Sequence, residues 1–449
     1  MNGAQQDPFV CTALATDLYQ LTMAQAYWRE GMHEPAVFDL FVRELPTKRP
    51  FLIAAGLEHA IAVLESFAFT STDLEYLDGL GLFGKAFLDY LAGLRFDGDL
   101  VALAEGTPVF ADEPLLEVIA PLPQAQLVET VLINQIHLPT MVASRAAQVV
   151  KAAQGRPVVD FGLRRAHGIE AGVKAARAAY LAGASATSNV QAGRAFGLPV
   201  SGTMAHSYVL AHDDELESFR QFADLYPETV LLVDTYETLA GVEKVAALSR
   251  ELGDAFRVRA IRIDSGDLGS LCRGARDVLD QAGLGDVTIF VSGDLDEHRV
   301  ARLVEDGVPV DGFGVGTHLV TSADAPYLNC AYKLVEYAGV PRMKLSSGKV
   351  TLPGRKQVFR QEDDGRAIGD LIARHGESLP GSPLLQPAMQ AGQRLADATP
   401  GLDQIRAHCR DRVARLPAAV REGRKDYPVS HSEALDKEAR RMTAGLARA

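Results

Sequence analysis

Residues 259–268 read RAIRIDSGDL, and the pattern in this stretch decides the fold class. A short β-branched run ends in a turn of Ser, Gly and Asp, and a helical stretch follows the turn. The same pattern recurs at 288–296 (TIFVSGDLD) and at 311–317 (DGFGVGT). Buried hydrophobic runs that alternate with helices are typical of a parallel sheet covered on both faces. This part of the chain therefore predicts an α/β fold.

Comparable runs lie on both sides of this stretch. They are PVVDFG (157–162), SATSN (185–189), LPVSGT (198–203), VLLVDTYE (230–237) and, after the others, KLVEY (333–337). Seven or eight βα units in succession predict a closed or nearly closed barrel, that is, an incomplete or irregular TIM-like βα barrel. Functional groups of such folds gather at the carboxyl ends of the strands.

The remainder of the chain predicts two flanking parts. Residues 1–150 mix helical stretches with short strands such as AVFDLFVREL (36–45), which indicates an α+β domain to which the C-terminal segment contributes. Residues 151–345 form the predicted barrel, with a helix expected over 165–181. Residues 346–449 begin with a turn-rich hairpin and continue as a charged, partly helical segment.

Composition limits the class of partner. A chain of 449 residues with 47% hydrophobic and 23% charged residues is typical of a folded protein of two or three units. Its net charge of -13 argues against a nucleic-acid partner or an anionic membrane surface. Without a long apolar run or a basic apolar leader, we expect a cytoplasmic protein. Cys11, Cys272, Cys330 and Cys409 are too far apart to indicate zinc or disulfides.

The turn IRIDSGDL carries Arg262, Asp264, Ser265 and Gly266 just after a predicted strand. Phosphorylated sugars need this mixture, because Mg²⁺ prefers carboxylate oxygens while phosphate prefers Arg and exposed backbone N–H groups. Ser, Gly and Asp also occur in βα turns for helix capping alone. The turn by itself therefore leaves both interpretations open.

Two further turns repeat the pattern and favour a phosphate site. Glycines at such turns let backbone amides approach a phosphate at a helix N-terminus. The candidate residues are Ser292, Gly293, Asp294, Gly314, Gly316 and Thr317.

SGTMAHS places His206 in a loop after one strand, and VLLVDTYE places Asp234 at the end of the next. A carboxylate that holds one imidazole nitrogen leaves the other free as a nucleophile or base. A single histidine among eleven is more often a surface or core residue. The position alone does not decide between the two.

DFGLRRAHG places Phe161 and Arg164 at another strand end. An aromatic face beside a guanidinium suits a flat anionic ring, through stacking and charge-assisted hydrogen bonds. The kinase interpretation of DFG fails, because the chain has no HRD catalytic loop, no VAIK strand and no preceding GxGxxG loop.

Taken in order, ten short strings resemble the nicotinate phosphoribosyltransferases over roughly residues 10 to 360. The strings are TDLYQLTMAQAYW, ELP, AAGLE, DFGLRRAHG, SGTMAHS, VDTYET, IRIDSGDL, VSGDLD, GVGT and PGRKQVFR. Each string alone is weak evidence, but their ordered combination is specific to the family.

The resemblance implies a type II phosphoribosyltransferase fold, in which an α+β domain joins an incomplete βα barrel, and a homodimer with shared active sites. The implied reaction makes nicotinate mononucleotide and pyrophosphate from nicotinate and phosphoribosyl pyrophosphate, the first step of NAD salvage from nicotinate. Coupled ATP hydrolysis places such enzymes among the ligases. Mg²⁺ is the implied cofactor and ATP the co-substrate.

The resemblance also implies individual roles. His206 matches the histidine that ATP phosphorylates, and Asp234 matches the carboxylate that orients it. Arg262 and Asp264 match residues of the ribose and pyrophosphate side, with Asp264 as a candidate Mg²⁺ ligand. Gly293, Asp294, Gly314 and Gly316 fall where the family binds the 5-phosphate.

Five further positions concern the base and the subunit interface. Phe161 and Arg164 match the platform for the pyridine ring, and Tyr19 matches an aromatic that covers the ring from the neighbouring subunit. Arg43 matches a basic residue brought across the interface to phosphate. Ser188 stands where nicotinamide-using relatives carry aspartate, and a carboxylate there would repel the carboxylate of nicotinate.

Three alternatives stay open at the level of sequence. Nicotinamide phosphoribosyltransferase is disfavoured by Ser188, and quinolinate phosphoribosyltransferase by the lack of a dense basic cluster. A barrel that binds a phosphosugar without turnover has little use for His206, Asp234 and Asp264 together.

In the hairpin region, Lys344 and Arg355 either contact ATP or pyrophosphate or belong to a solvated hairpin.

Overall fold

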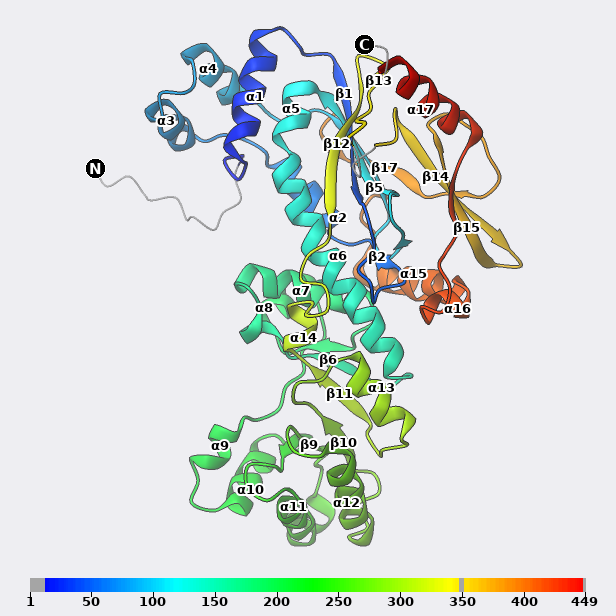
Figure 1. Cartoon of the computed structure of the whole chain (residues 1–449). Helices are drawn as coiled ribbons and strands as arrows, with labels where there is room; N and C mark the ends of the chain where they lie inside the picture. Colours follow the sequence, from blue (N-terminus) through cyan, green and yellow to red (C-terminus); the bar gives the residue numbers. More distant parts are fainter. Residues whose placement is uncertain (1–12, 347–350, 447–449) are drawn as a thin grey trace. The chain divides into compact units, whose positions relative to one another are not determined.

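The computed structural model describes residues 13–346 and 351–446, which fall into two compact units (Figure 1). One unit comprises Met1–Met141 with Tyr327–Ala449, and the other comprises Val142–Pro326. The C-terminal segment thus belongs to the same unit as the N-terminal segment. No helix among the described residues has the length and apolar character needed to cross a membrane.

The first unit is built on a seven-stranded antiparallel sheet in the order β13-β12-β1-β5-β3-β17-β18. Its strands are β1 (Pro35–Val42), β3 (Asp99–Leu103), β5 (Pro114–Pro121), β12 (Cys330–Tyr337), β13 (Val340–Pro341), β17 (Leu385–Gln390) and β18 (Gln393–Arg394). A four-stranded sheet follows the order β16-β14-β15-β19 and a two-stranded sheet pairs β2 with β4. These strands are β2 (Leu52–Ile53), β4 (Pro108–Val109), β14 (Lys356–Asp363), β15 (Arg366–Arg374), β16 (Ser382–Pro383) and β19 (Val429–His431).

Helices of this unit precede, separate and follow the strands. They are α1 (Leu18–Arg29), α2 (Leu57–Glu65), α3 (Ser71–Gly79), α4 (Lys85–Gly93), α5 (Leu122–Leu127), the first part of α6 (Glu129–Ala152), α15 (Leu402–Arg415), α16 (Ala418–Arg421) and α17 (Glu433–Leu446). The predicted hairpin is confirmed as β14 and β15, joined by Asp364 and Gly365, both of which have positive φ.

The second unit contains a six-stranded sheet in the order β7-β6-β11-β10-β9-β8, and every neighbouring pair is parallel. Its strands are β6 (Val158–Asp160), β7 (Ala186–Thr187), β8 (Val230–Leu232), β9 (Ala260–Ile263), β10 (Thr288–Val291) and β11 (Gly312–Val315). Its helices are α7 (Ile169–Leu181), α8 (Val190–Phe196), α9 (His206–Leu210), α10 (Glu215–Leu225), α11 (Thr238–Leu252), α12 (Leu268–Gln281), α13 (Glu297–Glu305) and α14 (Thr317–Val320), with short 3₁₀ turns at Leu163–Arg165 and Gly253–Ala255. The predicted parallel α/β sheet is confirmed.

Two runs that suggested barrel strands behave differently. LPVSGT forms only an isolated parallel bridge between Val200 and Thr187, because Pro199 lacks the N–H that a longer ladder needs. KLVEY belongs to β12, which lies in the first unit and pairs antiparallel with β1 of that same unit. Among the described residues no ladder joins the edge strands β7 and β8, so the sheet is open and a closed barrel is not formed.

Side-chain caps define where several helices of this unit begin. Asp267 accepts hydrogen bonds from the N–H groups of Gly269 and Ser270 at the start of α12, and Asp296 accepts one from Arg299 N–H at the start of α13. Helix α7 begins at Ile169, four residues later than predicted, because the chain first makes the 3₁₀ turn and then passes through Gly168 at φ 116°.

Buried charges cross-link the C-terminal segment to the antiparallel sheet of the first unit. Lys356 Nζ lies 2.7 Å from Asp39 Oδ2, and Lys356 N–H donates to Glu117 Oε1 at 2.7 Å. The side chains of Lys356 and Asp39 are each 2% exposed. A second buried pair joins Arg360 to Asp370 at 2.6 Å. Because unpaired buried charge is costly, the Lys356 contacts hold β14 to the seven-stranded sheet, and the Arg360–Asp370 pair holds β14 to β15.

Glu117→Gln is expected to change how stability depends on pH. Burial, reinforced by the charge of Asp39, raises the pKa of Glu117 to about 8. A carboxyl whose folded pKa is raised contributes stability that is complete below the unfolded pKa and is lost as pH rises through the folded pKa. Between about pH 5 and pH 9 the unfolding free energy of the wild type should therefore fall, relative to Glu117→Gln, by at least about 1 kcal/mol.

Urea unfolding at several pH values checks this prediction. Glu228→Gln is the matched control, since Glu228 is exposed and pairs with Arg259 at the surface. Parallel pH profiles for the wild type and Glu117→Gln would show that Glu117 does not titrate in this range.

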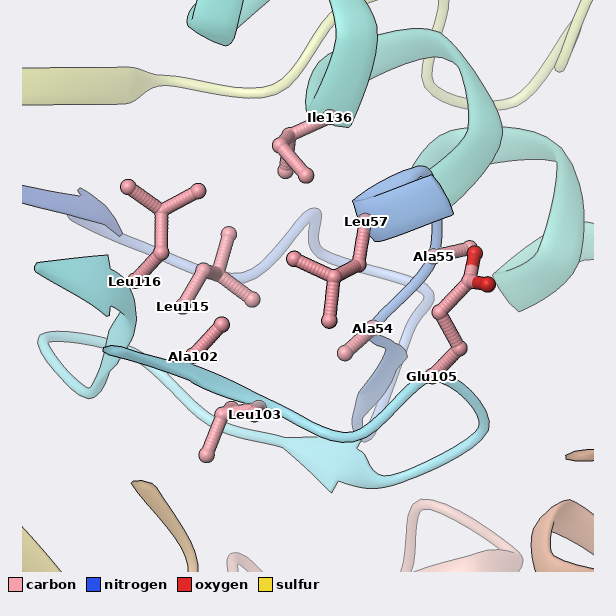
Figure 2. A pocket seen from close by; sticks show the side chains of 9 residues that line it. All are labelled: Ala54, Ala55, Leu57, Ala102, Leu103, Glu105, Leu115, Leu116 and Ile136. Atoms are coloured by element: carbon pink, nitrogen blue, oxygen red, sulfur yellow. The ribbon is translucent and has the colours of Figure 1, made fainter. Parts of the chain in front are cut away.

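A small hydrophobic cavity of about 10 Å³ lies in the first unit (Figure 2). Ala54, Leu57, Leu103, Leu116 and Ile136 are among the side chains around it, and Glu105 accepts a hydrogen bond from Gly56 N–H at 2.6 Å beside them. The volume matches about one water molecule, so the cavity is a packing defect of the core rather than a ligand site.

Cys272, Cys330 and Cys409 are free thiols, and Cys11 lies outside the described residues.

Candidate active site

The carboxyl ends of the six parallel strands lie along one edge of the sheet, and the candidate residues of the second unit follow those ends. We call this edge the carboxyl rim. The rim carries Phe161 and Arg164 after β6, Ser188 after β7, Asp234 after β8, Asp264, Ser265 and Gly266 after β9, Ser292, Gly293 and Asp294 after β10, and Gly316 and Thr317 after β11. Arg262 lies within β9 and Gly314 within β11, whereas His206 begins α9.

His206 has two neighbours on the carboxyl rim. Its Nδ1 lies 3.1 Å from Thr235 Oγ1, and its Nε2 lies 4.0 Å from Asp264 Oδ2. The imidazole is 39% exposed. One ring nitrogen is therefore held by a hydroxyl, while the other faces a carboxylate and stays accessible to a ligand.

Asp234 is buried and makes its hydrogen bonds with the next strand end. Its Oδ2 accepts from Asp264 N–H at 2.9 Å and from Ser265 Oγ at 2.7 Å. The resemblance implied that Asp234 orients His206, but in this structure the hydrogen-bond partner of the imidazole is Thr235. Asp234 instead holds the Asp264–Ser265 turn. Its Oδ1 is buried and, among the described residues, has no hydrogen-bond partner.

Asp264 is fixed from three sides. In addition to the bond from its N–H to Asp234, its Oδ1 accepts a hydrogen bond from Ser292 Oγ. Gly293, at φ 95°, approaches the Asp264 carbonyl so closely that a Cβ would lie 1.8 Å from that oxygen. The glycine of VSGD is therefore required by packing between two strand ends. Asp264 Oδ2, which faces His206, is left for other partners.

Arg262 extends from β9 toward Phe161. Its Nη1 donates to Thr203 Oγ1 at 2.6 Å, and its guanidinium carbon lies 5.9 Å from the centre of the Phe161 ring. Burial lowers the pKa of Arg262, whereas the charges of Asp264 and Asp234 act in the opposite direction. Nε is buried and, within the described part of the chain, lacks a hydrogen-bond partner. A buried cationic donor without a partner suits an anionic ligand.

Gly314 and Gly316 provide space for the chain segment around Phe161. A Cβ on Gly314 would lie 2.6 Å from the Phe161 ring, and a Cβ on Gly316 would lie 3.0 Å from the Phe161 carbonyl. The Phe161 ring also lies 5.9 Å from that of Phe290. The glycines that were predicted to admit a phosphate thus also allow Phe161 to pack across β11.

Asp294 and Thr317 follow the two central strands of the sheet, β10 and β11. Asp294 adopts φ 53° and its Oδ1 lies 2.8 Å from His318 Nε2, on α14 just after Thr317. Arg299 donates to the Asp294 carbonyl at 3.0 Å. The Asp294 turn is therefore tied to both neighbouring helices.

Tyr19 and Arg43 belong to the first unit. Tyr19 lies in α1 with 49% of its surface exposed, and burial of the hydroxyl together with Glu129 and Asp17 raises its pKa. Arg43 follows β1, and its N–H donates to the Asn329 carbonyl at 3.1 Å. The roles implied for them across a subunit interface remain predictions.

Sequence reasoning missed three residues of the carboxyl rim. Thr235 contacts His206, Thr203 contacts Arg262, and the side chain of Asp160 accepts hydrogen bonds from two turns. All three lie inside the strings quoted for the resemblance or directly beside them. Among the described residues no cluster of three or more His, Cys, Asp or Glu side chains is arranged to hold a metal ion.

A parallel sheet with Arg, Asp and Gly at its carboxyl ends is the arrangement in which α/β proteins bind phosphorylated ligands. Comparisons with known proteins identify the family to which this α/β protein is similar. Residues 14–137 match the nicotinate phosphoribosyltransferase (NAPRTase) N-terminal domain, and residues 157–349 match the nicotinate phosphoribosyltransferase (NAPRTase) family.

Individual relatives agree with these matches. A nicotinate phosphoribosyltransferase of Mycobacterium tuberculosis is 53% identical over 433 residues, which cover 96% of this chain and 94% of that protein. One from Bacillus subtilis is 45% identical, over 82% of this chain and 77% of that protein. The crystal structure of human nicotinic acid phosphoribosyltransferase matches with a TM-score of 0.85 at 30% identity, covering 95% of this chain and 99% of the human chain. The chain belongs to the nicotinate phosphoribosyltransferase family.

Proposed function

We propose that this protein is a cytoplasmic, ATP-dependent nicotinate phosphoribosyltransferase that catalyses the first step of NAD salvage from nicotinate. The family supplies the reaction class, and the carboxyl rim supplies groups for each part of it. The single observation that carries the proposal is the grouping of Arg262, Asp264 and His206. A half-buried guanidinium whose buried Nε has no partner among the described residues, a carboxylate and an accessible imidazole lie on one part of the rim.

The base is assigned to the β6 and β7 ends. Phe161 offers an aromatic face, Arg164 is an exposed cation for the carboxylate of nicotinate, and Ser188 is uncharged. The ring nitrogen of nicotinate is itself the nucleophile. Since this nitrogen carries no proton that must be removed, the protein positions the substrates and stabilises an oxocarbenium-like sugar electrostatically.

Phosphoribosyl pyrophosphate is assigned to the β9, β10 and β11 ends. Arg262 neutralises the departing pyrophosphate, and the turns at Ser265–Gly266, Ser292–Asp294 and Gly316–Thr317 offer backbone N–H groups to phosphate oxygens. Ser292 donates its hydrogen bond to Oδ1 of Asp264, so this bond does not occupy the second carboxylate oxygen, Oδ2. A single carboxylate fits Mg²⁺, which usually keeps substrate phosphates and water as its other ligands. Bound Mg²⁺ would offset charge on the pyrophosphate.

ATP is assigned to His206. The imidazole attacks the γ-phosphorus, the bond to the β-bridging oxygen breaks, and ADP leaves. Hydrolysis of phosphorylated His206 then accompanies each transfer and favours product formation. The structure supports this step through the contact of Nδ1 with Thr235 and the exposure of the ring.

The proposal includes a homodimer with shared active sites, in which Tyr19 covers the pyridine ring of the neighbouring subunit and Arg43 contacts its phosphate. Support comes from the exposure of Tyr19 on α1. The nicotinamide-using and non-catalytic alternatives remain outcomes of the experiments below.

Ser188→Asp is expected to weaken the use of nicotinate. A carboxylate at this position would lie near the substrate carboxylate, and partly desolvated like charges repel. We expect kcat/KM for nicotinate to fall by about 100-fold, while KM for phosphoribosyl pyrophosphate changes little. Ser188→Asn is the control, because it adds bulk without charge. Equal losses in the two variants would assign the effect to size.

The coupled reaction tests the proposed function as a whole. The purified protein is incubated with nicotinate, phosphoribosyl pyrophosphate, Mg²⁺ and ATP, and ADP and nicotinate mononucleotide are measured together with each reactant omitted in turn. The proposal expects ADP and mononucleotide to rise together. Mononucleotide at the same rate without ATP would contradict the coupling, and the absence of both products would favour a non-catalytic phosphosugar-binding protein.

A further inference from the structure

Three oxygen atoms of Asp160 hold the two turns assigned to the base. Oδ1 accepts a hydrogen bond from Gly162 N–H at 2.8 Å, and Oδ2 accepts one from the Thr187 hydroxyl at 2.7 Å. The Asp160 carbonyl accepts a third from Ser188 N–H at 2.8 Å. Asp160 is 3% exposed, so water does not compete for these bonds. One buried residue therefore ties the end of β6 to the end of β7.

The β7 turn is closed from its other side as well. Thr187 Oγ1 also accepts from Asn189 N–H at 3.0 Å. The Asn189 side chain donates to the Gly172 carbonyl at 3.2 Å and accepts from Ala192 N–H at 3.0 Å. Ser188 thus lies between two residues that are almost fully buried and hydrogen-bonded. Its backbone position is set by Asp160 and Thr187.

The β6 turn is equally constrained. Phe161 N–H donates to the Val315 carbonyl at 2.9 Å, and a Cβ on Gly162 would lie 2.7 Å from Val320 and 2.9 Å from Asp160 Oδ1. The backbone on each side of Phe161 is therefore fixed. A change in the Asp160–Thr187 hydrogen bond would alter the position of Ser188 relative to Phe161.

We propose that Asp160 and Thr187 are positioning residues that set the separation between Phe161 and Ser188, and with it the width of the slot for the pyridine ring. This inference rests on the proposed function, because it takes Phe161, Arg164 and Ser188 as the residues that bind the base. Asp160 and Thr187 act through these residues, since both are buried behind the turns.

Thr187→Val tests the inference, since valine keeps the shape and removes the hydroxyl. The change leaves Asp160 Oδ2 and Asn189 N–H without their shared partner, so the β7 turn is expected to shift. KM for nicotinate should rise by about tenfold, whereas kcat and KM for phosphoribosyl pyrophosphate should stay within about twofold. Thr187→Ser retains the hydroxyl and should restore the wild-type KM for nicotinate.

Thr288→Val is the matched control on the same sheet. Thr288 begins β10 at the opposite edge, where its hydroxyl donates to the Arg259 carbonyl at 3.2 Å. Thr288→Val removes one hydrogen bond, as Thr187→Val removes hydrogen bonds of Thr187. The control variant should leave every kinetic constant unchanged.

The outcomes separate this inference from the proposed function. A selective rise in KM for nicotinate in Thr187→Val, reversed in Thr187→Ser, supports the inference. Equal constants in the wild type, Thr187→Val and Thr288→Val would overturn the inference and leave the proposed function intact. If Thr187→Val does not fold, Asp160→Asn takes its place, and nicotinate binding is measured by calorimetry. Unchanged nicotinate binding in Asp160→Asn would overturn the inference. Failure of the wild type itself to convert nicotinate would contradict the proposed function.

Discussion

His206→Asn is expected to abolish the transfer of phosphate from ATP to the protein. Only an imidazole nitrogen at this position can accept the phosphoryl group, and asparagine keeps a hydrogen-bonding group toward Thr235 without that nucleophile. Intact-mass analysis after incubation with ATP should show an acid-labile phosphate on the wild type and none on the variant. ATP hydrolysis should fall by at least about 100-fold.

His212→Asn is the matched control. This histidine follows α9, its Nδ1 lies 2.8 Å from the Tyr208 carbonyl, and it has no part in the proposed reaction. It should keep both the phosphate and the ATPase rate. An acid-labile phosphate that persists in His206→Asn would place the phosphorylated residue elsewhere.

Arg262→Lys is expected to cause the second large loss. Lysine keeps the positive charge but cannot reproduce the planar fork, in which Nη1 contacts Thr203 while Nε stays available to a ligand. If pyrophosphate takes that free donor in the transition state, kcat/KM for phosphoribosyl pyrophosphate should fall by about 100-fold or more. Initial rates at varied phosphoribosyl pyrophosphate measure the effect.

Arg259→Lys supplies the comparison at the opposite end of the same strand. Arg259 precedes β9, is exposed and pairs with Glu228. The substitution should change kcat/KM by less than about twofold. Similar kinetics in the two variants would mean that Arg262 is a structural residue of the sheet.

The parallel sheet was predictable because its signal is local. Runs such as VLLVDTYE and TIFVSGDLD combine a buried strand with a polar turn and a capped helix, and all of these occur in the structure. LPVSGT and KLVEY carry similar runs of residues but have different partners. Strand partners are chosen by tertiary packing, so β12 pairs with β1 across nearly three hundred residues of chain. Periodicity cannot show such a choice.

The grouping of the candidate residues of the second unit on one edge was also predictable, since parallel strands bring their carboxyl ends together. Individual contacts were not. Asp234 holds the Asp264 turn and Thr235 contacts His206, because the side chain directed at the imidazole depends on the backbone turn after β8. The assignment of Asp234 to His206 came from resemblance, which carries no geometry of this chain.

Glycines illustrate the same limit. The sequence predicted that Gly293 and Gly314 let a phosphate approach the backbone, which remains a prediction. The structure shows a further need, because a Cβ would meet the Asp264 carbonyl at Gly293 and the Phe161 ring at Gly314. A one-dimensional pattern indicates that a glycine is required but does not identify the group that approaches it.

The most direct test of the central claim is the choice of base. Purified wild-type protein is given phosphoribosyl pyrophosphate, Mg²⁺ and ATP with nicotinate, nicotinamide or quinolinate in parallel, and the mononucleotide is followed by chromatography. The account predicts mononucleotide from nicotinate alone. Mononucleotide from nicotinamide or quinolinate, or none from any base, would contradict it.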